Sequence, residues 1–139
     1  MLLGCNTHNF STSFIEENFK KEQISLLELH NKERTSRGYK TLILDEKLCE
    51  YAQAHAKKMA KTGDLYHSSM NDLQEVNEDA NWVAENIAWG QISEQDVVIS
   101  WMKSTGHRWN ILGSGFTRVG FGLTKDSKDR IYWCAVFSD

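Results

Sequence analysis

Residues 117–138 read TRVGFGLTKDSKDRIYWCAVFS, and this stretch decides the fold class of the chain. Two runs rich in β-branched and aromatic residues, 117–124 and 130–138, flank the polar stretch 125–129. Such runs on either side of a short Asp-, Ser- and Lys-rich stretch are typical of two strands and their turn. The pattern therefore predicts an antiparallel hairpin at the C-terminal end of the sequence.

The chain before this hairpin is predicted to be mostly helical. Asp45 is a favourable N-cap for the apolar stripe that follows it, and Gly63 is a favourable stop. Ser93 is predicted to cap another helix, and helices are also expected over 14–37 and, briefly, around 72–76. A helix-rich first half followed by a hairpin predicts an α+β fold in which helices cover a small antiparallel sheet.

Length and composition narrow the functional classes. The 139 residues fit one domain, which we place at 15–139, preceded by a flexible tether at 1–14. The formal net charge is −3 and no dense Lys/Arg stripe is present, so nucleic-acid binding is not expected. No stretch approaches the roughly 20 apolar residues that a membrane span requires.

The first residues resemble the end of a bacterial lipoprotein signal. Leu2-Leu3-Gly4-Cys5 sets a small residue directly before a cysteine, and a polar stretch, 6–13, follows it. The resemblance predicts a membrane tether through Cys5 and a location outside the cell or on its surface, as a lipoprotein. The alternative is an incidental cysteine in a cytoplasmic N-terminal segment.

Three short segments carry most of the chemical information. They read YHSS at 66–69, AENIAWG at 84–90 and GHRWNIL at 106–112. Each places a histidine or a carboxylate among small and aromatic residues, where such groups cost free energy unless they are hydrogen-bonded or metal-bound. The segments together predict one site containing His67, Glu85 and His107.

The same segments resemble the CAP superfamily of cysteine-rich secretory, antigen 5 and pathogenesis-related proteins, in its compact bacterial branch. The resemblance covers about residues 20–138 and implies a three-layer α-β-α sandwich. The matching segments, in family order, are HNKER at 30–34, 48–59, HSS at 67–69, AENI at 84–87, Trp101, GHRWNIL at 106–112, VGFG at 119–122 and YWCAVF at 132–137.

The resemblance also implies a cleft lined by two histidines and two acidic residues, where some members bind a divalent metal. The histidines correspond to His67 and His107 and one acidic residue to Glu85, but Ser104 stands where the second glutamate is expected. We therefore expect weak binding of an ion such as Zn²⁺ by the two histidines, because catalytic zinc usually has three protein ligands. Glu85 would orient a histidine, accept a proton or bind weakly. The alternative is a purely structural hydrogen-bonded network.

We expect a binding or interaction module in preference to an enzyme. The alternative is a cleft hydrolase, metal-assisted or serine-dependent, with His67, Glu85 and His107 as catalytic residues. No nucleophile elbow is present, and Ser68 and Ser69 are expected to cap backbone groups. A lipid- or sterol-binding role follows only from the resemblance. The expected partner is thus a protein or a lipid that the sequence does not identify.

Several other polar residues are expected to be structural. His30, Asn31 and Arg34 are predicted to join the first helix to its neighbours by hydrogen bonds. His55 lies on an apolar stripe and is predicted to be a satisfied core histidine. Gly120-Phe121-Gly122 is predicted to allow close backbone packing.

Cysteine and tryptophan residues are also assigned to the core. Cys49 and Cys134 are expected as two packed thiols, although their pairing is left open by the sequence. Trp82, Trp89 and Trp109 are expected in the core, with Trp109 as a candidate for the cleft wall.

Overall fold

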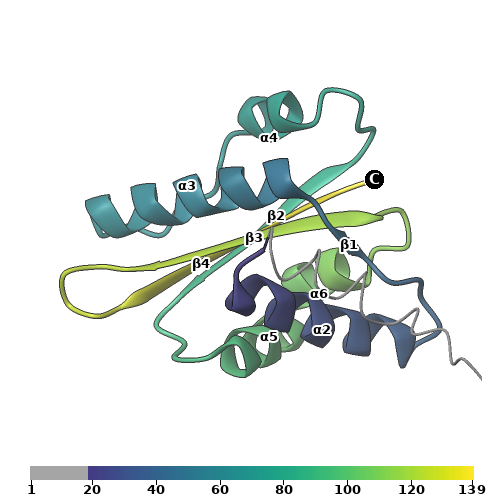
Figure 1. The fold of residues 1–139 in the computed structure, drawn as a ribbon, viewed down its shortest axis with the longest axis horizontal. Coiled ribbons are helices and arrows are strands. Elements are labelled where there is room, and N and C mark those ends of the chain that lie inside the picture. The colour runs from purple at the N-terminus through teal and green to yellow at the C-terminus, as the bar shows by residue number, and fades with distance from the viewer. Residues whose placement is uncertain (1–18) are drawn as a thin grey trace, which may run out of the picture.

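The structure, a computed structural model, describes residues 19–139, and its centre is a four-stranded sheet in the order β1-β3-β4-β2 (Figure 1). β3 pairs with β4 and β4 with β2 in antiparallel fashion, whereas β1 runs parallel to β3. The strands are β1 (Ile43–Leu44), β2 (Val83–Trp89), β3 (Arg118–Lys125) and β4 (Ile131–Ser138).

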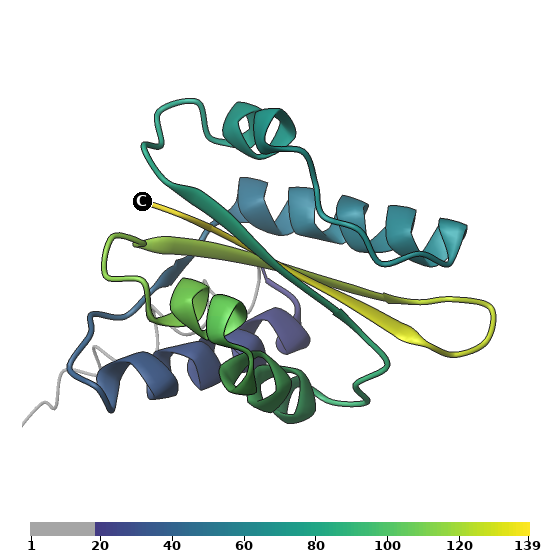
Figure 2. The same ribbon diagram turned by 180° about the vertical axis from the view of Figure 1, so that it is seen from behind.

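Helices cover both faces of the sheet (Figures 1 and 2). α3 (Glu46–Thr62) and α4 (Met70–Val76) lie on one side. α2 (Lys21–Thr35), α5 (Glu94–Lys103) and α6 (Thr105–Leu112) lie on the other. The predicted α+β fold and its three-layer α-β-α sandwich are confirmed, and the parallel strand β1 makes the sheet mixed where an antiparallel one was expected.

The predicted hairpin is confirmed almost to the residue. β3 and β4 pair from Arg118 opposite Ser138 to Lys125 opposite Ile131. In the turn, the Asp126 carboxylate accepts hydrogen bonds from the backbone N–H groups of Lys128 at 2.8 Å and Arg130 at 3.0 Å. A side chain that satisfies the turn backbone in this way is the mechanism by which aspartate favours turns.

Two local signals fix α3 on the sheet. The Asp45 carboxylate accepts a hydrogen bond from Leu48 N at 2.9 Å, and Gly63 ends the helix at a φ of 73°, as predicted. A Cβ atom added at Gly120 would lie 2.1 Å from the Leu48 carbonyl carbon. This strand glycine therefore lets α3 approach the sheet backbone, which confirms the predicted close packing.

α2 begins at Lys21, later than the predicted helix over 14–37, whose first residues lie outside the described part of the chain. The expected tether at 1–14 and its Cys5 anchor lie outside it too. β2 was not predicted, because its residues VAENIAW show neither strict alternation nor a continuous apolar run. It forms by pairing with β4, nearly 50 residues further along the chain.

Each face of the sheet has its own apolar cluster. The cluster beneath α3 contains Tyr132, Cys134 and Val136, and the cluster beneath α2 and α5 contains Trp101, Phe121 and Phe137. Cys49 and Cys134 are both free and buried, in agreement with two packed thiols. No helix within residues 19–139 is long and apolar enough to cross a membrane.

Polar residues on α2 are placed partly as expected. The Asn31 amide exchanges two hydrogen bonds with the backbone of Leu42, at 3.1 and 2.7 Å, as predicted. His30 is different, because its Nδ1 bonds only the Leu26 carbonyl of its own helix and its ring packs against Phe121 with centroids 4.7 Å apart. The prediction that His30 joins neighbouring elements by hydrogen bonds was therefore wrong.

The assignment of three tryptophans to the core was also wrong. Trp82 is 68% exposed, Trp89 38% and Trp109 75%. Trp82 lies just before an edge strand, Trp89 ends that strand, and Trp109 lies on the outer side of α6. Exposure at these positions depends on which layer covers them, and a tryptophan's own chemistry does not reveal that.

Candidate functional site

Glu85 lies at the centre of the candidate site. It belongs to β2, which is an edge strand, and it is only 6% exposed. Its Oε1 accepts a hydrogen bond from the backbone N–H of Ser68 at 2.9 Å, and its Oε2 accepts one from the Ser68 hydroxyl at 2.6 Å. The Cys134 thiol lies 3.8 Å from Oε2. Nearly all the capacity of this buried carboxylate is thus used within the protein.

His67 completes this arrangement. Its Nδ1 lies 2.9 Å from Glu85 Oε1, while 59% of the histidine side chain is exposed. An ionised carboxylate only accepts hydrogen bonds, so Nδ1 must carry the hydrogen and donate it. The hydrogen bond to Glu85 therefore fixes the ring orientation, and no hydrogen bond within the described residues occupies Nε2 of this mostly exposed side chain.

The segment that carries His67 is itself held in place from α3. His55 Nε2 lies 2.7 Å from the carbonyl oxygen of Tyr66, so it donates a hydrogen bond to the residue directly before His67. Ser69 caps α4 by accepting a hydrogen bond from Asp72 N at 3.1 Å. His55 is therefore the satisfied core histidine that was predicted, and Ser69 the predicted capping residue. The prediction was wrong for Ser68, whose hydroxyl bonds Glu85.

His107 approaches this pair from the opposite layer. It lies on α6, and its carbonyl oxygen accepts a hydrogen bond from the Asn86 amide at 3.0 Å. Asn110 Nδ2 donates to Asn86 Oδ1 at 2.9 Å, which ties α6 to the edge strand a second time. Burial, and secondly the neighbouring His67, lower the pKa of His107 from its ordinary value, so its ring stays neutral at pH 7.

The structure thus brings together the three residues that the sequence predicted. His67 and Glu85 are in direct contact, and His107 lies close enough for His67 to affect its pKa. Ser104, where a second glutamate was expected, lies between α5 and α6 and offers no carboxylate. Within residues 19–139, no three His, Cys, Asp or Glu side chains converge as a metal site.

The described side chains therefore do not form a closed metal site, and an open site would have His67 and His107 as its two imidazole ligands. Two neutral imidazoles are suitable ligands for Zn²⁺, and water would complete the shell. A carboxylate bonded to the far nitrogen of a ligand histidine fixes its tautomer and raises its basicity. Glu85 has this relation to His67, whereas its own oxygens are already engaged.

The hydrogen bonds of Ser68 do not arrange it as a nucleophile activated by His67. A serine nucleophile is activated by a histidine that accepts its proton. The Ser68 hydroxyl instead donates to Glu85, and the His67 Nδ1 donates to the same carboxylate. Both residues are therefore donors to Glu85, with no serine-to-histidine hydrogen bond between them in the described chain.

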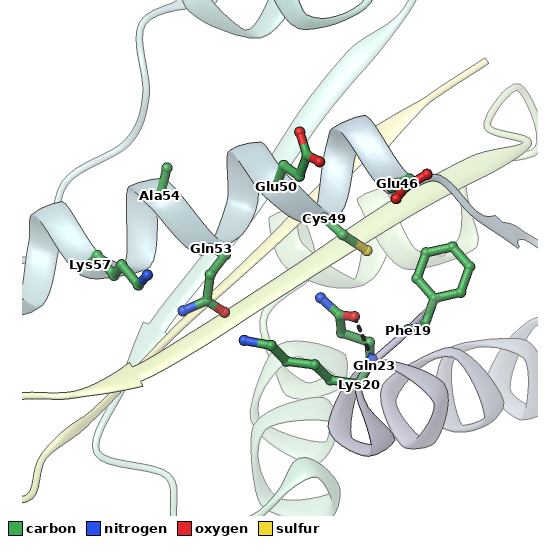
Figure 3. A pocket seen from close by; sticks show the side chains of 9 residues that line it. All are labelled: Phe19, Lys20, Gln23, Glu46, Cys49, Glu50, Gln53, Ala54 and Lys57. Carbon is green, nitrogen blue, oxygen red and sulfur yellow. Dashed lines mark hydrogen bonds between the residues drawn. The ribbon is translucent and has the colours of Figure 1, made fainter. Parts of the chain in front are cut away.

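A separate hollow of about 410 Å³ lies between α3 and the start of α2 (Figure 3). Its walls carry charges of both signs, from Lys20, Lys57, Glu46 and Glu50, and Cys49 also lines it. None of His67, Glu85 and His107 lines it. This hollow is therefore distinct from the candidate site.

Sequence reasoning missed the residues that position the site. Ser68 was quoted beside His67 but was not recognised as the main partner of Glu85. Asn86 and Asn110, which hold α6 at the edge strand, were also quoted without a role. Amides placed directly beside Glu85 and near His107 are the signal that could have identified them.

The comparisons agree with this architecture. The model of the Cysteine-rich secretory protein (CAP) family matches residues 27–137. Uncharacterized protein YkwD of Bacillus subtilis (strain 168) is 35% identical over 106 residues, which cover 72% of this chain and 41% of YkwD. The chain therefore spans about two fifths of the length of that relative.

Two solved structures share the fold. An extracellular protein containing an SCP domain from Bacillus anthracis str. Ames superposes with a TM-score of 0.74 at 24% identity, over 84% of this chain and 40% of that one. NaASP2, solved with Zn²⁺, superposes with a TM-score of 0.65 at 15% identity, over 88% of this chain and 82% of that one. At these identities the likeness shows the fold.

Proposed function

Since this chain belongs to the Cysteine-rich secretory protein family, we propose that it is an extracellular binding module whose cleft weakly holds a divalent cation such as Zn²⁺. The cleft lies at the free edge of β2, where His67 and His107 would be the ligands. The partner that the module binds is a protein or a lipid. The proposed tether through Cys5 would hold the module at the cell surface.

One observation carries the cation proposal. The His67 Nδ1 to Glu85 Oε1 contact of 2.9 Å leaves Nε2 of a mostly exposed ring available to a ligand. A carboxylate bonded to one ring nitrogen in this way orients a histidine for a ligand at the other nitrogen. NaASP2, which shares the fold, has been solved with Zn²⁺, and this supports an ion of that kind.

The location and the binding role rest on different support. The Bacillus anthracis protein with this fold is described as extracellular, which favours the same location here. A binding role is favoured over serine-dependent hydrolysis because the Ser68 hydroxyl donates to Glu85, so His67 does not accept its proton. Bound Zn²⁺ would supply charge and open coordination positions in the cleft.

A calorimetric titration with Zn²⁺ near pH 7.5 tests the cation site. We expect saturable binding to the unaltered chain, and loss of binding when His67→Ala and His107→Ala are combined. Trp109→Ala is the matched control, because it changes an exposed residue of the same helix α6. Equal binding by the unaltered chain and the double variant would refute the site.

Ser104→Glu provides a test in the opposite direction. It restores a carboxylate at the position where the family resemblance places the second acidic residue, so a third ligand would become available. We expect the Ser104→Glu variant to bind Zn²⁺ more tightly than the unaltered chain. Unchanged affinity would show that this position does not face the ion.

A further inference from the structure

An aromatic groove lies on the outer side of α6, and none of His67, Glu85 and His107 lines it. Tyr39, Trp82 and Trp109 line one cavity of about 280 Å³, with Leu112 and Phe116 completing its apolar wall. Tyr39 is 39% exposed, and the two tryptophans are among the most exposed large side chains of the described residues. These five residues form the aromatic groove.

The walls of the aromatic groove are held by buried and charged groups behind them. The Arg34 guanidinium donates to the carbonyl oxygens of Ile111 at 2.9 Å and Gly113 at 2.8 Å, so it fixes the loop that carries Phe116. On the other side, the Asp139 carboxylate accepts a hydrogen bond from Trp82 N at 2.9 Å. The groove is thus preorganised, which lowers the entropic cost of binding.

Gly113 shows how tightly the loop is built. A Cβ atom at this position would lie 2.6 Å from Cδ2 of Phe116, whose ring forms part of the groove wall. The same ring packs against the buried Phe137, with centroids 5.7 Å apart. The Phe116 wall is therefore fixed to the core of the domain.

The groove continues into a second hollow of about 430 Å³ that shares Tyr39, Trp109 and Leu112 with the first. Arg108 is the charged residue that lines this continuation, and no carboxylate lines either hollow. Arg108 forms no ion pair with any of residues 19–139. Charge complementarity therefore favours a ligand that is neutral along the groove and acidic at the Arg108 end.

The tryptophans also leave hydrogen-bond donors free. The buried Trp101 and Trp133 donate their indole N–H groups to the carbonyls of Ile87 and Gln91. Within the described residues, the indole N–H groups of Trp82 and Trp109 have no such partner. Exposed aromatic planes with free N–H donors match an extended, proline-rich peptide. The proline rings of such a peptide pack between aromatic side chains, and its backbone carbonyls accept hydrogen bonds.

Other occupants fit these walls less well. A sugar with many hydroxyl groups is best held by several carboxylates and amides, and the walls offer a few hydroxyl groups but neither carboxylates nor side-chain amides. A second copy in a two-fold arrangement would bring two Arg108 side chains into one interface without an acidic partner in the groove. A cationic ligand would be repelled by Arg108.

We propose that the aromatic groove binds an extended, proline-rich peptide segment that carries an acidic residue next to Arg108. None of the 139 residues is proline, so the peptide belongs to another molecule or to sequence outside these residues. The proposed cation ligands His67 and His107 do not line the groove, so peptide binding does not require bound metal.

The test uses the complete 139-residue chain with amide and indole N–H groups observed by NMR. The probe is a short, capped, proline-rich peptide with one central glutamate, and its twin carries glutamine instead. We expect the glutamate peptide to shift the indole signals of Trp82 and Trp109 and to bind more tightly than its twin. Signals of Trp101 and Trp133 stay in place and report that the fold is intact.

Substitutions then assign the binding to the groove. Trp109→Ala should weaken peptide binding about thirtyfold, as expected for an aromatic residue that dominates an interface. Arg108→Ala should remove the preference for glutamate over glutamine. Trp89→Ala is the control, because that exposed tryptophan stacks with Arg130 and lines neither hollow; it should leave the affinity unchanged.

Three results would overturn the proposal. The first is the absence of indole shifts at millimolar peptide, with the fold intact. The second is a response of the same indole signals to neutral oligosaccharides and not to the peptides, which would identify a sugar site. The third is a doubling of the molecular mass in solution that is lost in Trp109→Ala, which would show that a second copy covers the groove.

Discussion

Arg34 and Glu85 are both charged and almost fully buried, yet they have opposite surroundings. The Arg34 side chain donates only to backbone carbonyls, those of Lys40, Ile111, Gly113 and Phe116, at 2.7 to 3.3 Å. Glu85 instead receives hydrogen bonds from the side chains of Ser68 and His67. One of these partners, His67, is mostly exposed.

The difference shows how a buried charge can be assigned to structure or to function. The partners of Arg34 cannot titrate and have no free valence for a ligand, so Arg34 connects α2 to the loop after α6. The partner of Glu85 keeps a free nitrogen that faces solvent. A buried charge is therefore a functional candidate when its own hydrogen bonds orient an exposed, reactive group.

The largest expected effect is at Arg34. Arg34→Ala leaves one buried and three partly buried carbonyls without this donor, so we expect the free energy of unfolding to fall by about 3–5 kcal/mol. Urea unfolding followed by circular dichroism measures this change. Arg37→Ala is the control, since its ion pair with Glu33 is exposed and contributes about 0.3–0.5 kcal/mol. Similar losses in both variants would contradict a structural role specific to Arg34.

The second prediction concerns His30, which lies one helical turn from Arg34 on α2 and should make the stability of the fold depend on pH. Burial lowers the pKa of His30 from 6.5 to about 4. Between these pH values the unfolded chain binds a proton that the folded chain does not bind. The free energy of unfolding should therefore fall by about 3 kcal/mol as the pH drops from 6.5 to 4, and this contribution is fully present above pH 6.5.

The His30→Phe variant isolates the contribution of His30 to the pH dependence of stability. The variant keeps an aromatic ring beside Phe121 but removes the titrating group. Unfolding experiments at a series of pH values should show a shallower loss of stability on acidification than in the unaltered chain. Parallel pH profiles for the two proteins would refute the assignment to His30.

For the Glu85 side of the comparison, the Glu85→Gln variant tests whether Glu85 orients the His67 ring. The substitution removes the charge that fixes the Nδ1 hydrogen, so the affinity for Zn²⁺ should fall about 10- to 100-fold, the usual range when such a partner is removed. Calorimetry measures the change, and circular dichroism verifies that the variant remains folded. Unaltered affinity would place Glu85 with Arg34, as a structural residue only.

The smallest expected effect is at Ser68. Ser68→Ala removes one donor to Glu85 but keeps the backbone N–H bond at 2.9 Å. We expect the free energy of unfolding to decrease by about 1 kcal/mol. Denaturant titration beside Ser69→Ala, which removes the cap of α4, would distinguish the two serines. A loss as large as that of Arg34→Ala would show that Glu85 depends on this hydroxyl more than the structure indicates.

The parts of the fold that sequence predicted are those set by local chemistry. The Asp126 turn and the Asp45 cap depend on side chains within four residues of the groups they satisfy. β2 escaped prediction because its pairing partner β4 is remote in the chain. The parallel β1–β3 pair is equally non-local, so an antiparallel sheet was expected where the sheet is mixed.

In the candidate site too, the sequence predicted what local chemistry decides and missed what depends on distant contacts. His67, Glu85 and His107 could be named from the resemblance and from their unusual neighbours. The direction of each hydrogen bond could not, because it depends on how the segment after α3 meets the sheet edge. The exposure of Trp109 was missed for a similar reason: only the assembled layers show that its side of α6 is uncovered.

The tautomer of His67 tests the central claim most directly. Nitrogen-resolved NMR of the imidazole rings at pH 7.5, before and after addition of Zn²⁺, distinguishes a protonated Nδ1 from a protonated Nε2. The hydrogen bond to Glu85 predicts a protonated Nδ1 and a free Nε2 whose resonance alone among the two moves strongly with Zn²⁺. A protonated Nε2, unaffected by Zn²⁺, would contradict the claim that Glu85 orients His67 as a ligand.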